Sequence, residues 1–136
     1  MTKDEVNKVM LIDDNTTDRF IHSKLLEIYS IGKEVLEFES GADALKFLKE
    51  HKENSEELPD VILLDVLMPE MSGFDFLVYL EQIFGDLAKK PALFMLSSTD
   101  DESDLKKAHR SQIVQRMLRK PFSPDALVKA LGELKF

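Results

Sequence analysis

Short apolar runs alternate with amphipathic stretches five times along the chain. The apolar runs hold five to seven residues and are rich in Val, Ile and Leu, as expected of strands in a parallel sheet. Between them, apolar residues recur at spacings of three and four, which is typical of amphipathic helices. This alternation predicts a parallel sheet with helices on both faces. The predicted strands are Val6–Ile12, Glu34–Phe38, Val61–Asp65, Ala92–Ser97 and Val114–Leu118.

Each predicted helix follows a residue that can cap its N-terminus. In four cases a side-chain acceptor precedes an acidic residue by three positions. This pattern satisfies free backbone N–H groups of the first helical turn. The fifth helix is predicted to begin after Ser123, because Pro124 suits the first helical position. The four pairs are Asn15 with Asp18, Ser40 with Asp43, Ser72 with Asp75, and Thr99 with Glu102.

Length and composition narrow the class of protein. A chain of 136 residues is most simply one domain, and we expect a single domain over residues 1–136, with its core at about 8–134 and no output domain. The lack of cysteine excludes disulfides and zinc–thiolate sites. No apolar run approaches the roughly 20 residues of a membrane span, and the N-terminus lacks a signal peptide, so we expect a cytoplasmic protein without membrane contact. The net charge of −8 disfavours direct binding to nucleic acid.

Acidic residues lie at the carboxyl ends of two predicted strands, where ligands bind in open α/β sheets. Asp13 and Asp14 come directly after the first strand, and Asp65 ends the third. We expect a flavodoxin-like, doubly wound five-stranded sheet of order 2-1-3-4-5 with five helices, in which these ends meet at the ligand-binding switch point. Two carboxylates 4 Å apart repel by about 4 kcal/mol at an effective dielectric constant of 20. The cluster therefore calls for a protonated carboxyl or a bound cation, and oxygen ligands favour Mg²⁺.

A hydroxyl and an ammonium group are expected beside these carboxylates. Ser97 ends the fourth predicted strand and Lys120 follows the fifth. A carboxylate near a hard cation, an ammonium and a hydroxyl suits phosphoryl transfer, where catalysis is mostly positioning and charge neutralisation. We therefore interpret Asp65 as a covalent phosphoryl acceptor. Asp65 could alone be a turn residue, and Asp13 or Asp14 could alone cap a helix. Neither role would explain why all three aspartates, Ser97 and Lys120 lie at or just after strand ends.

Four short motifs make the chain similar to the response-regulator receiver domain of two-component signalling, in its stand-alone form. Each motif alone is common, but here all four occur in order after the first, third, fourth and fifth predicted strands. The resemblance covers residues 8 to 134 or so. The motifs are LIDDN (11–15), LLDVLMPEMSG (63–73), MLSS (95–98) and KPF (120–122).

The resemblance implies a metal site and a phosphoacceptor. Asp65 would accept the phosphoryl group. Asp14 would bind Mg²⁺ (or Mn²⁺) directly, together with Asp65 and the main-chain carbonyl of Leu67. Asp13 would act mainly through a metal-bound water.

The resemblance also implies roles for residues near the last two strands, with two departures. The hydroxyl of Ser97 would contact the phosphoryl group, and Lys120 would be the family's lysine, followed by Pro121, often across a cis bond. Met117 stands where the family usually has Tyr or Phe, and we interpret it as a packing residue. Gln112–Ile113 stand where a small pair usually closes the fourth helix, which indicates a different exit from that helix.

The resemblance implies a phosphorelay module whose only catalysis is its own phosphorylation and dephosphorylation. A sensor histidine kinase or a histidine phosphotransfer protein would donate to Asp65, and the altered surface would bind a downstream protein. Two alternatives stay open. One is a phosphorylation-independent scaffold, suggested by Met117 and Ile113. The other is a haloacid-dehalogenase-type phosphohydrolase, which needs a second aspartate where Leu67 stands.

The three histidines fall outside this site. We interpret His22, His51 and His109 as solvated residues of helices or loops. The sequence therefore predicts neither a histidine phosphotransfer site nor a histidine-based metal centre.

Overall fold

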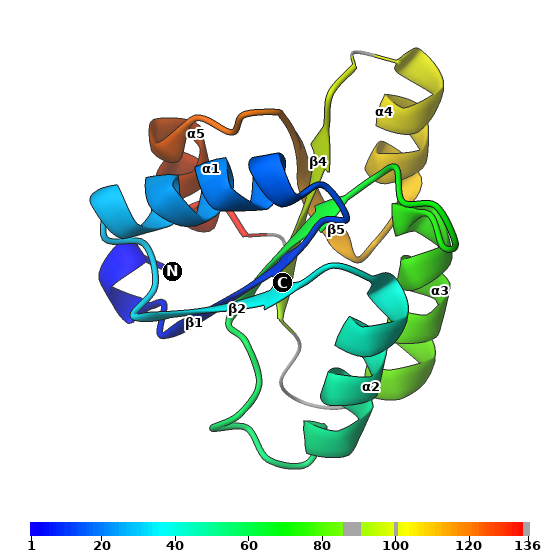
Figure 1. Cartoon of the computed structure of the whole chain (residues 1–136), viewed down its shortest axis with the longest axis horizontal. Helices are drawn as coiled ribbons and strands as arrows, with labels where there is room; N and C mark the ends of the chain where they lie inside the picture. The colour runs from blue at the N-terminus through cyan, green and yellow to red at the C-terminus, as the bar shows by residue number, and fades with distance from the viewer. Residues whose placement is uncertain (86–90, 100, 135–136) are drawn as a thin grey trace.

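The strands form one parallel sheet in the order β2-β1-β3-β4-β5 (Figure 1). The computed structural model describes residues 1–85, 91–99 and 101–134; residues 135 and 136, at the end of the predicted domain, lie outside the described residues. The observed order confirms the predicted doubly wound, flavodoxin-like fold. The strands are β1 (Lys8–Ile12), β2 (Glu34–Phe38), β3 (Val61–Asp65), β4 (Ala92–Ser97) and β5 (Val114–Arg119).

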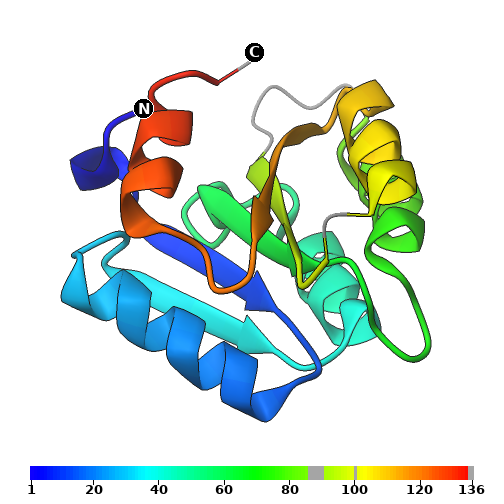
Figure 2. The ribbon, with the colours of Figure 1, turned by 90° about the horizontal axis from the view of Figure 1, so that it is seen from above.

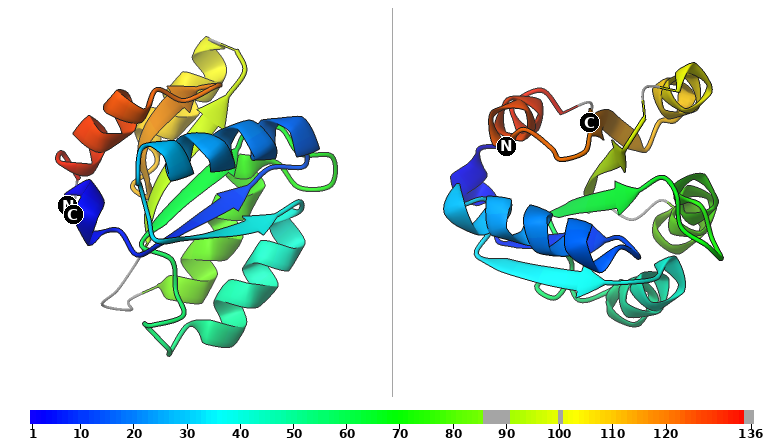
Figure 3. Two further views of the ribbon diagram at one scale, coloured as in Figure 1. Left: turned by 60° about the vertical axis from the view of Figure 1, so that its left-hand side comes forward. Right: turned by 45° about the horizontal axis from the view of Figure 1, so that its top comes forward.

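Helices cover both faces of the sheet and enclose two separate cores (Figures 2 and 3). Successive residues of a strand point to opposite faces. In β3, for example, Leu64 packs into the core under α2, α3 and α4, whereas Leu63 packs into the core under α1 and α5. This double burial explains why β3 reads as a continuous apolar run. The helices are α1 (Thr16–Ile28), α2 (Gly41–His51), α3 (Gly73–Phe84), α4 (Glu102–Arg110) and α5 (Pro124–Leu131).

Four of the five predicted helix caps are confirmed. In these caps the side chain accepts a hydrogen bond from the backbone N–H three residues later. The prediction of Thr99 as the cap of the fourth helix is wrong. That helix begins after Asp101, whose carboxylate accepts from the Ser103 N–H at 2.8 Å, while Thr99 bonds back to Ser97. The confirmed caps are Asn15, Ser40, Ser72 and Ser123.

The first residue of one strand and the last residue of another differ from the prediction. The first strand begins at Lys8 rather than Val6, because Lys3–Glu5 form a 3₁₀-helix whose last turn is closed by the Val6 N–H. The fifth strand continues to Arg119, which pairs with Ser97. Within the described ranges, none of the helices combines the length and the apolar character needed to cross a bilayer.

The exit from α4 differs from a glycine-terminated helix, as expected from Ile113. Ser111 caps the helix in an extended conformation (φ −72°, ψ 136°). Its hydroxyl accepts hydrogen bonds from the N–H groups of Ile113 at 3.1 Å and Val114 at 3.3 Å. The serine side chain thus holds the chain that leaves α4 by bonding to the first N–H groups of the following segment, without a left-handed residue.

The prediction of three solvated histidines is wrong for His22. Its ring is buried against Phe122, with 5.3 Å between the ring centroids. Its Nδ1 has no hydrogen-bond partner among the described residues. His51 is half-buried beside Phe47, and only His109 is exposed. The helical pattern did not predict the burial of His22, because α1 packs against the segment after β5 as well as against the sheet.

Candidate functional site

The carboxyl ends of β1 and β3 bring three aspartates together. The two strands are neighbours and pair Ile12 with Leu64, so the residues that follow this pair lie side by side. One carboxylate oxygen from each of Asp13, Asp14 and Asp65 lies within 4.8 Å of the other two. Asp13 and Asp65 are buried, whereas Asp14 is exposed. The cluster is therefore anchored in the sheet and open to solvent on one side.

Asp13 is the most deeply buried of the three, with no exposed surface. One oxygen of its carboxylate accepts from the Asn15 N–H at 2.9 Å, and the other accepts from Lys120 Nζ at 2.7 Å. Its main-chain carbonyl accepts from Arg19 at 2.7 Å. A buried charge is tolerated when it is paired and hydrogen-bonded in this way.

Lys120 lies between three carboxylates. Besides Asp13, its Nζ is 3.1 Å from Asp65 Oδ1 and 3.1 Å from Asp18 Oδ2. Burial disfavours the charged ammonium. The hydrogen bond to Asp13 and the charges of Asp65 and Asp13 together outweigh burial and raise the pKa of Lys120. Lys120 therefore carries its positive charge throughout the neutral range.

Asp18 is the residue of this site that the sequence did not reveal. Its position three residues after Asn15 indicated a helix-capping pair, and its N–H does bond to the Asn15 side chain. The contact with Lys120 spans 102 positions and depends on how α1 lies beside the segment after β5. An acid in the first turn of the helix after Asp13 and Asp14 was the one available signal.

Asp65 sits in an environment that disfavours its charge. Its residue is 5% exposed, and its Oδ1 accepts from the Leu67 N–H at 3.3 Å. Burial, and then the negative charge of Asp13, raise the pKa of Asp65 to about 6, against the opposing effect of Lys120. The backbone N–H of Leu67 thus lies at Asp65, although the residue as a whole is 66% exposed. The structure therefore places a carboxylate that gains from added positive charge at the end of β3.

Gly73 allows the β3–α3 connection to close tightly over Asp65. Its N–H donates to the carbonyl of Val66 at 2.8 Å. A Cβ at this position would lie 2.7 Å from the Asp65 carbonyl oxygen and 2.7 Å from Cε of Met95. Such distances are too short for any side chain, so the glycine that ends the second motif, LLDVLMPEMSG, is required for steric reasons.

The hydroxyl of Ser97 faces its own loop. Ser97 ends β4, next to the strand that carries Asp65, and its carbonyl accepts from the Lys120 N–H at 2.8 Å. Its hydroxyl donates to the Thr99 carbonyl at 2.9 Å and accepts from the Thr99 N–H at 3.1 Å. The structure brings the main chain of Ser97 to the site, but the hydroxyl bonds to Thr99 rather than to Asp65.

The position of Met117 in β5 agrees with a packing role. Met117 pairs with Met95 in the β4–β5 ladder, is half-buried and contacts the core under α2, α3 and α4. The bond between Lys120 and Pro121 is cis.

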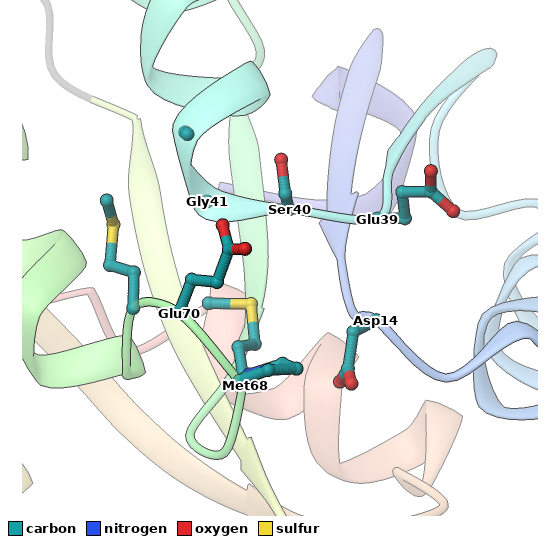
Figure 4. Close-up of a pocket in the computed structure, with 9 residues that line it drawn as sticks. Asp14, Glu39, Ser40, Gly41, Met68 and Glu70 are labelled. Carbon is teal, nitrogen blue, oxygen red and sulfur yellow. The ribbon is translucent and has the colours of Figure 1, made fainter.

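A cavity of about 550 Å³ adjoins the exposed side of the acidic cluster. Figure 4 shows Asp14 from the β1–α1 connection facing this space, with Met68 and Glu70 from the β3–α3 connection. Glu39 and the start of α2 complete the wall. Three acids on one cavity make a negative potential that attracts cations to the cluster.

The donor set of the cluster fits a hard divalent cation. Asp13, Asp14 and Asp65 offer only oxygen, and these oxygens are close enough to share one ion. Carboxylates around an open site are the ligands that Mg²⁺ prefers, since it keeps several waters. The three aspartates would hold such an ion.

Comparisons with known proteins agree with this geometry. The chain matches the family model of the response regulator receiver domain over residues 9–132. It is similar to the protein PilH of Pseudomonas aeruginosa, with 26% identity over 125 residues that cover 92% of this chain and 94% of PilH. A solved two-component response regulator from Cytophaga hutchinsonii is similar with a TM-score of 0.86 and 26% identity, over 94% of this chain and 96% of that one. A response regulator receiver protein from Dyadobacter fermentans has a TM-score of 0.83 and 30% identity, over 93% and 95% of the two chains. The matched region contains the acidic cluster and Lys120.

Proposed function

The chain belongs to the response regulator receiver domain family, and from this premise we propose that Asp65 accepts a phosphoryl group in a reaction that requires Mg²⁺. Receiver domains are Mg²⁺-binding modules of two-component signalling. One observation carries the proposal. The buried Asp65 carboxylate lies within 4.8 Å of two further carboxylates and 3.1 Å from an ammonium group that is charged at neutral pH. This is the charge pattern expected at a phosphoryl acceptor.

The residues of the chain suggest how the transfer would proceed. A carboxylate oxygen of Asp65 forms the new P–O bond while the P–N bond of a donor phosphohistidine breaks. The imidazole leaves with the electron pair and takes a proton from solvent. Lys120 neutralises negative charge at the phosphoryl oxygens, and the Leu67 N–H donates a hydrogen bond beside it. Mg²⁺, when bound, supplies further positive charge there.

The donor and the target follow from the family. We propose that the donor is a sensor histidine kinase or a histidine phosphotransfer protein in the cytoplasm. The phosphorylated form would then bind a partner protein through an altered surface. For this to happen the Ser97 hydroxyl must leave Thr99 and turn toward the phosphoryl group.

Intact-mass spectrometry tests the acceptor. Wild-type protein incubated with Mg²⁺ and a small acyl phosphate should gain one phosphoryl group. Asp65→Asn should gain none, and Asp125→Asn should behave like wild type, because Asp125 is an exposed residue of the first turn of α5. An unmodified wild-type protein, or an equal adduct on Asp65→Asn, would contradict the proposal.

A phosphorylation-independent scaffold is the second candidate. Met117 favours it, because a half-buried methionine stands where the family usually has an aromatic ring to follow a hydroxyl switch at Ser97. A scaffold would bind its partner with the same affinity in wild type and in Asp65→Asn after both have been incubated with Mg²⁺ and an acyl phosphate. A pull-down with the two treated proteins would measure this. A phosphohydrolase is not favoured, since Leu67, two residues after Asp65, cannot transfer a proton.

A further inference from the structure

A groove between α2 and α3 gathers positive charge on an acidic protein. The two helices lie side by side on one face of the sheet (Figures 1 and 3). The α2–α3 groove has a volume of about 420 Å³. Among the described residues, those that line it include three cations and no acid, although the whole chain carries a net charge of −8. Its principal residues are Leu45, Lys46, Lys49 and Lys52 on one side and Tyr79 and Ile83 on the other.

The three lysines are available for a partner. All three are exposed. Within residues 1–85, 91–99 and 101–134, none of the ion pairs, side-chain hydrogen bonds or cation–ring contacts involves Lys46, Lys49 or Lys52. Other lysines of the chain do have such contacts: Lys8 pairs with two glutamates, and Lys107 lies over the ring of Phe74.

The lysines form a regular row. They are spaced three residues apart, and Lys52 caps α2 with helical backbone angles, so they share one side of the helix. At a rise of about 1.5 Å per residue, neighbours in the row are roughly 5 Å apart along the axis. Carboxylates spaced three or four residues apart on another helix have the same interval.

The rest of the groove is amphipathic. Tyr79 is 48% exposed on the α3 side, and Leu45 and Ile83 are half-buried at the base. Apolar side chains at the base of a helix–helix groove and charges along its rim are the features with which amphipathic helices are bound. A partner with apolar residues on one side and acids along its edge would match both.

Charge decides between a protein helix and a polyanion. Nucleic acid or an anionic membrane extends well beyond three lysines and would meet the negative charge of the remaining surface. A short acidic helix needs only a few cations, all of which the groove supplies. We propose that the α2–α3 groove docks an acidic amphipathic helix of a partner protein. This binding would occur at a surface separate from the acidic cluster and goes beyond phosphoryl acceptance.

Binding of a model helix tests the groove. The probe is a short synthetic helix with glutamate at every third or fourth position and leucine on one side, titrated into the isotope-labelled full chain and followed by NMR. The expected shift changes lie in α2 and α3, and binding should weaken as salt is added. Lys46→Glu/Lys49→Glu should weaken binding at least about tenfold. Tyr79→Ala should weaken it without changing its salt dependence.

A matched variant separates local from overall charge. Lys33→Glu/Lys129→Glu changes the net charge by the same amount at two exposed lysines, one just before β2 and one in α5, and should alter affinity less than about twofold. Equal losses in the two double variants would overturn the proposal. It would also be overturned by shift changes outside α2 and α3, by no saturable binding, by self-association through this face, or by tighter binding to phosphatidylserine vesicles or duplex DNA. Melting temperatures would verify that each variant is folded. If Lys46→Glu/Lys49→Glu does not fold, Lys46→Ala/Lys49→Ala would be used in its place.

Discussion

Lys120 Nζ lies 3.1 Å from Asp18 Oδ2, a contact that joins the segment after β5 to the first turn of α1. The same ammonium also contacts Asp65 at 3.1 Å. Asp18 is 34% exposed at its side chain and therefore has access to solvent as an alternative to Lys120. The two aspartates thus share one cation, and the strength of one contact affects the other.

Removing the charge of Asp18 should lower the pKa of Asp65. In Asp18→Asn the ammonium is left to Asp13 and Asp65, and one nearby negative charge is gone. The pKa of Asp65, raised to about 6 in the wild type, should fall, as measured by NMR titration of its carboxyl carbon. Asp43→Asn is the matched control, because Asp43 has the same place in the first turn of α2. An unchanged pKa in Asp18→Asn would show that the contact has no electrostatic effect.

The contribution of Asp65 to the stability of the metal-free protein should fall as pH rises between about 4 and 6. The pKa of Asp65 is raised by burial from its ordinary 3.8 to about 6, so in this window the folded state binds more protons than the unfolded chain. The free energy of unfolding contributed by this group therefore falls as pH increases, and the loss persists above pH 6. Asp65→Asn should be more stable than wild type at pH 7.5 by about 1–3 kcal/mol.

Urea unfolding of both proteins at pH 4 and pH 7.5 measures this difference. Comparing wild type with variant cancels the other titrating groups. A gap between them that does not widen with pH would contradict the raised pKa.

Mg²⁺ should raise the melting temperature through the acidic cluster. A ligand that binds the folded state stabilises it by about 1.4 kcal/mol at ten times its dissociation constant. Asp14→Asn should abolish this effect with little change in metal-free stability, because Asp14 is exposed. Asp13→Asn should instead destabilise the metal-free protein, since it breaks a buried 2.7 Å ion pair with Lys120. Calorimetry with and without Mg²⁺ measures these melting temperatures. Equal metal-free melting temperatures for Asp13→Asn and Asp14→Asn would contradict the prediction.

Gly73→Ala should destabilise the protein and impair phosphoryl acceptance together. Its Cβ would lie 2.7 Å from the Asp65 carbonyl oxygen, so the strand end or the loop must move, at about 1–3 kcal/mol. Gly132→Ala is the control, because a Cβ there would be 3.4 Å from the nearest atom, the Lys129 carbonyl oxygen. Chemical unfolding and intact-mass spectrometry follow the two effects. A fully stable and active Gly73→Ala would disprove the steric role.

The sequence predicted features that depend on local patterns. Strand positions follow from hydrophobic periodicity, and four caps follow from the residues before each helix. The convergence of Asp13, Asp14 and Asp65 follows once the strand order of the flavodoxin-like fold is assumed. The sequence pattern did not show that Asp13 is buried and Asp14 exposed, because burial on one side of a loop is not encoded in a dipeptide. The cap at Asp101 was missed since Thr99 could cap equally well in sequence terms.

The sequence pattern could not predict which side chains from different elements come into contact. The contact of Asp18 with Lys120 and the burial of His22 both arise where α1 packs beside the segment after β5. Neither residue differs in type or spacing from an ordinary solvated residue of an amphipathic helix. The orientation of the Ser97 hydroxyl is a choice between rotamers, which only the surrounding hydrogen-bond groups decide.

The sheet divides the interior into two compartments, and no buried side chain of the described residues belongs to both. Leu26 of α1 lies in one and Leu48 of α2 in the other, and both are fully buried. Truncations at distant sites without common neighbours add in their effects on unfolding free energy, within about 0.5 kcal/mol. Substitutions could therefore accumulate on the α2–α3 side during evolution without compensating changes beneath α1 and α5, so that the two halves of the molecule are free to diverge at different rates.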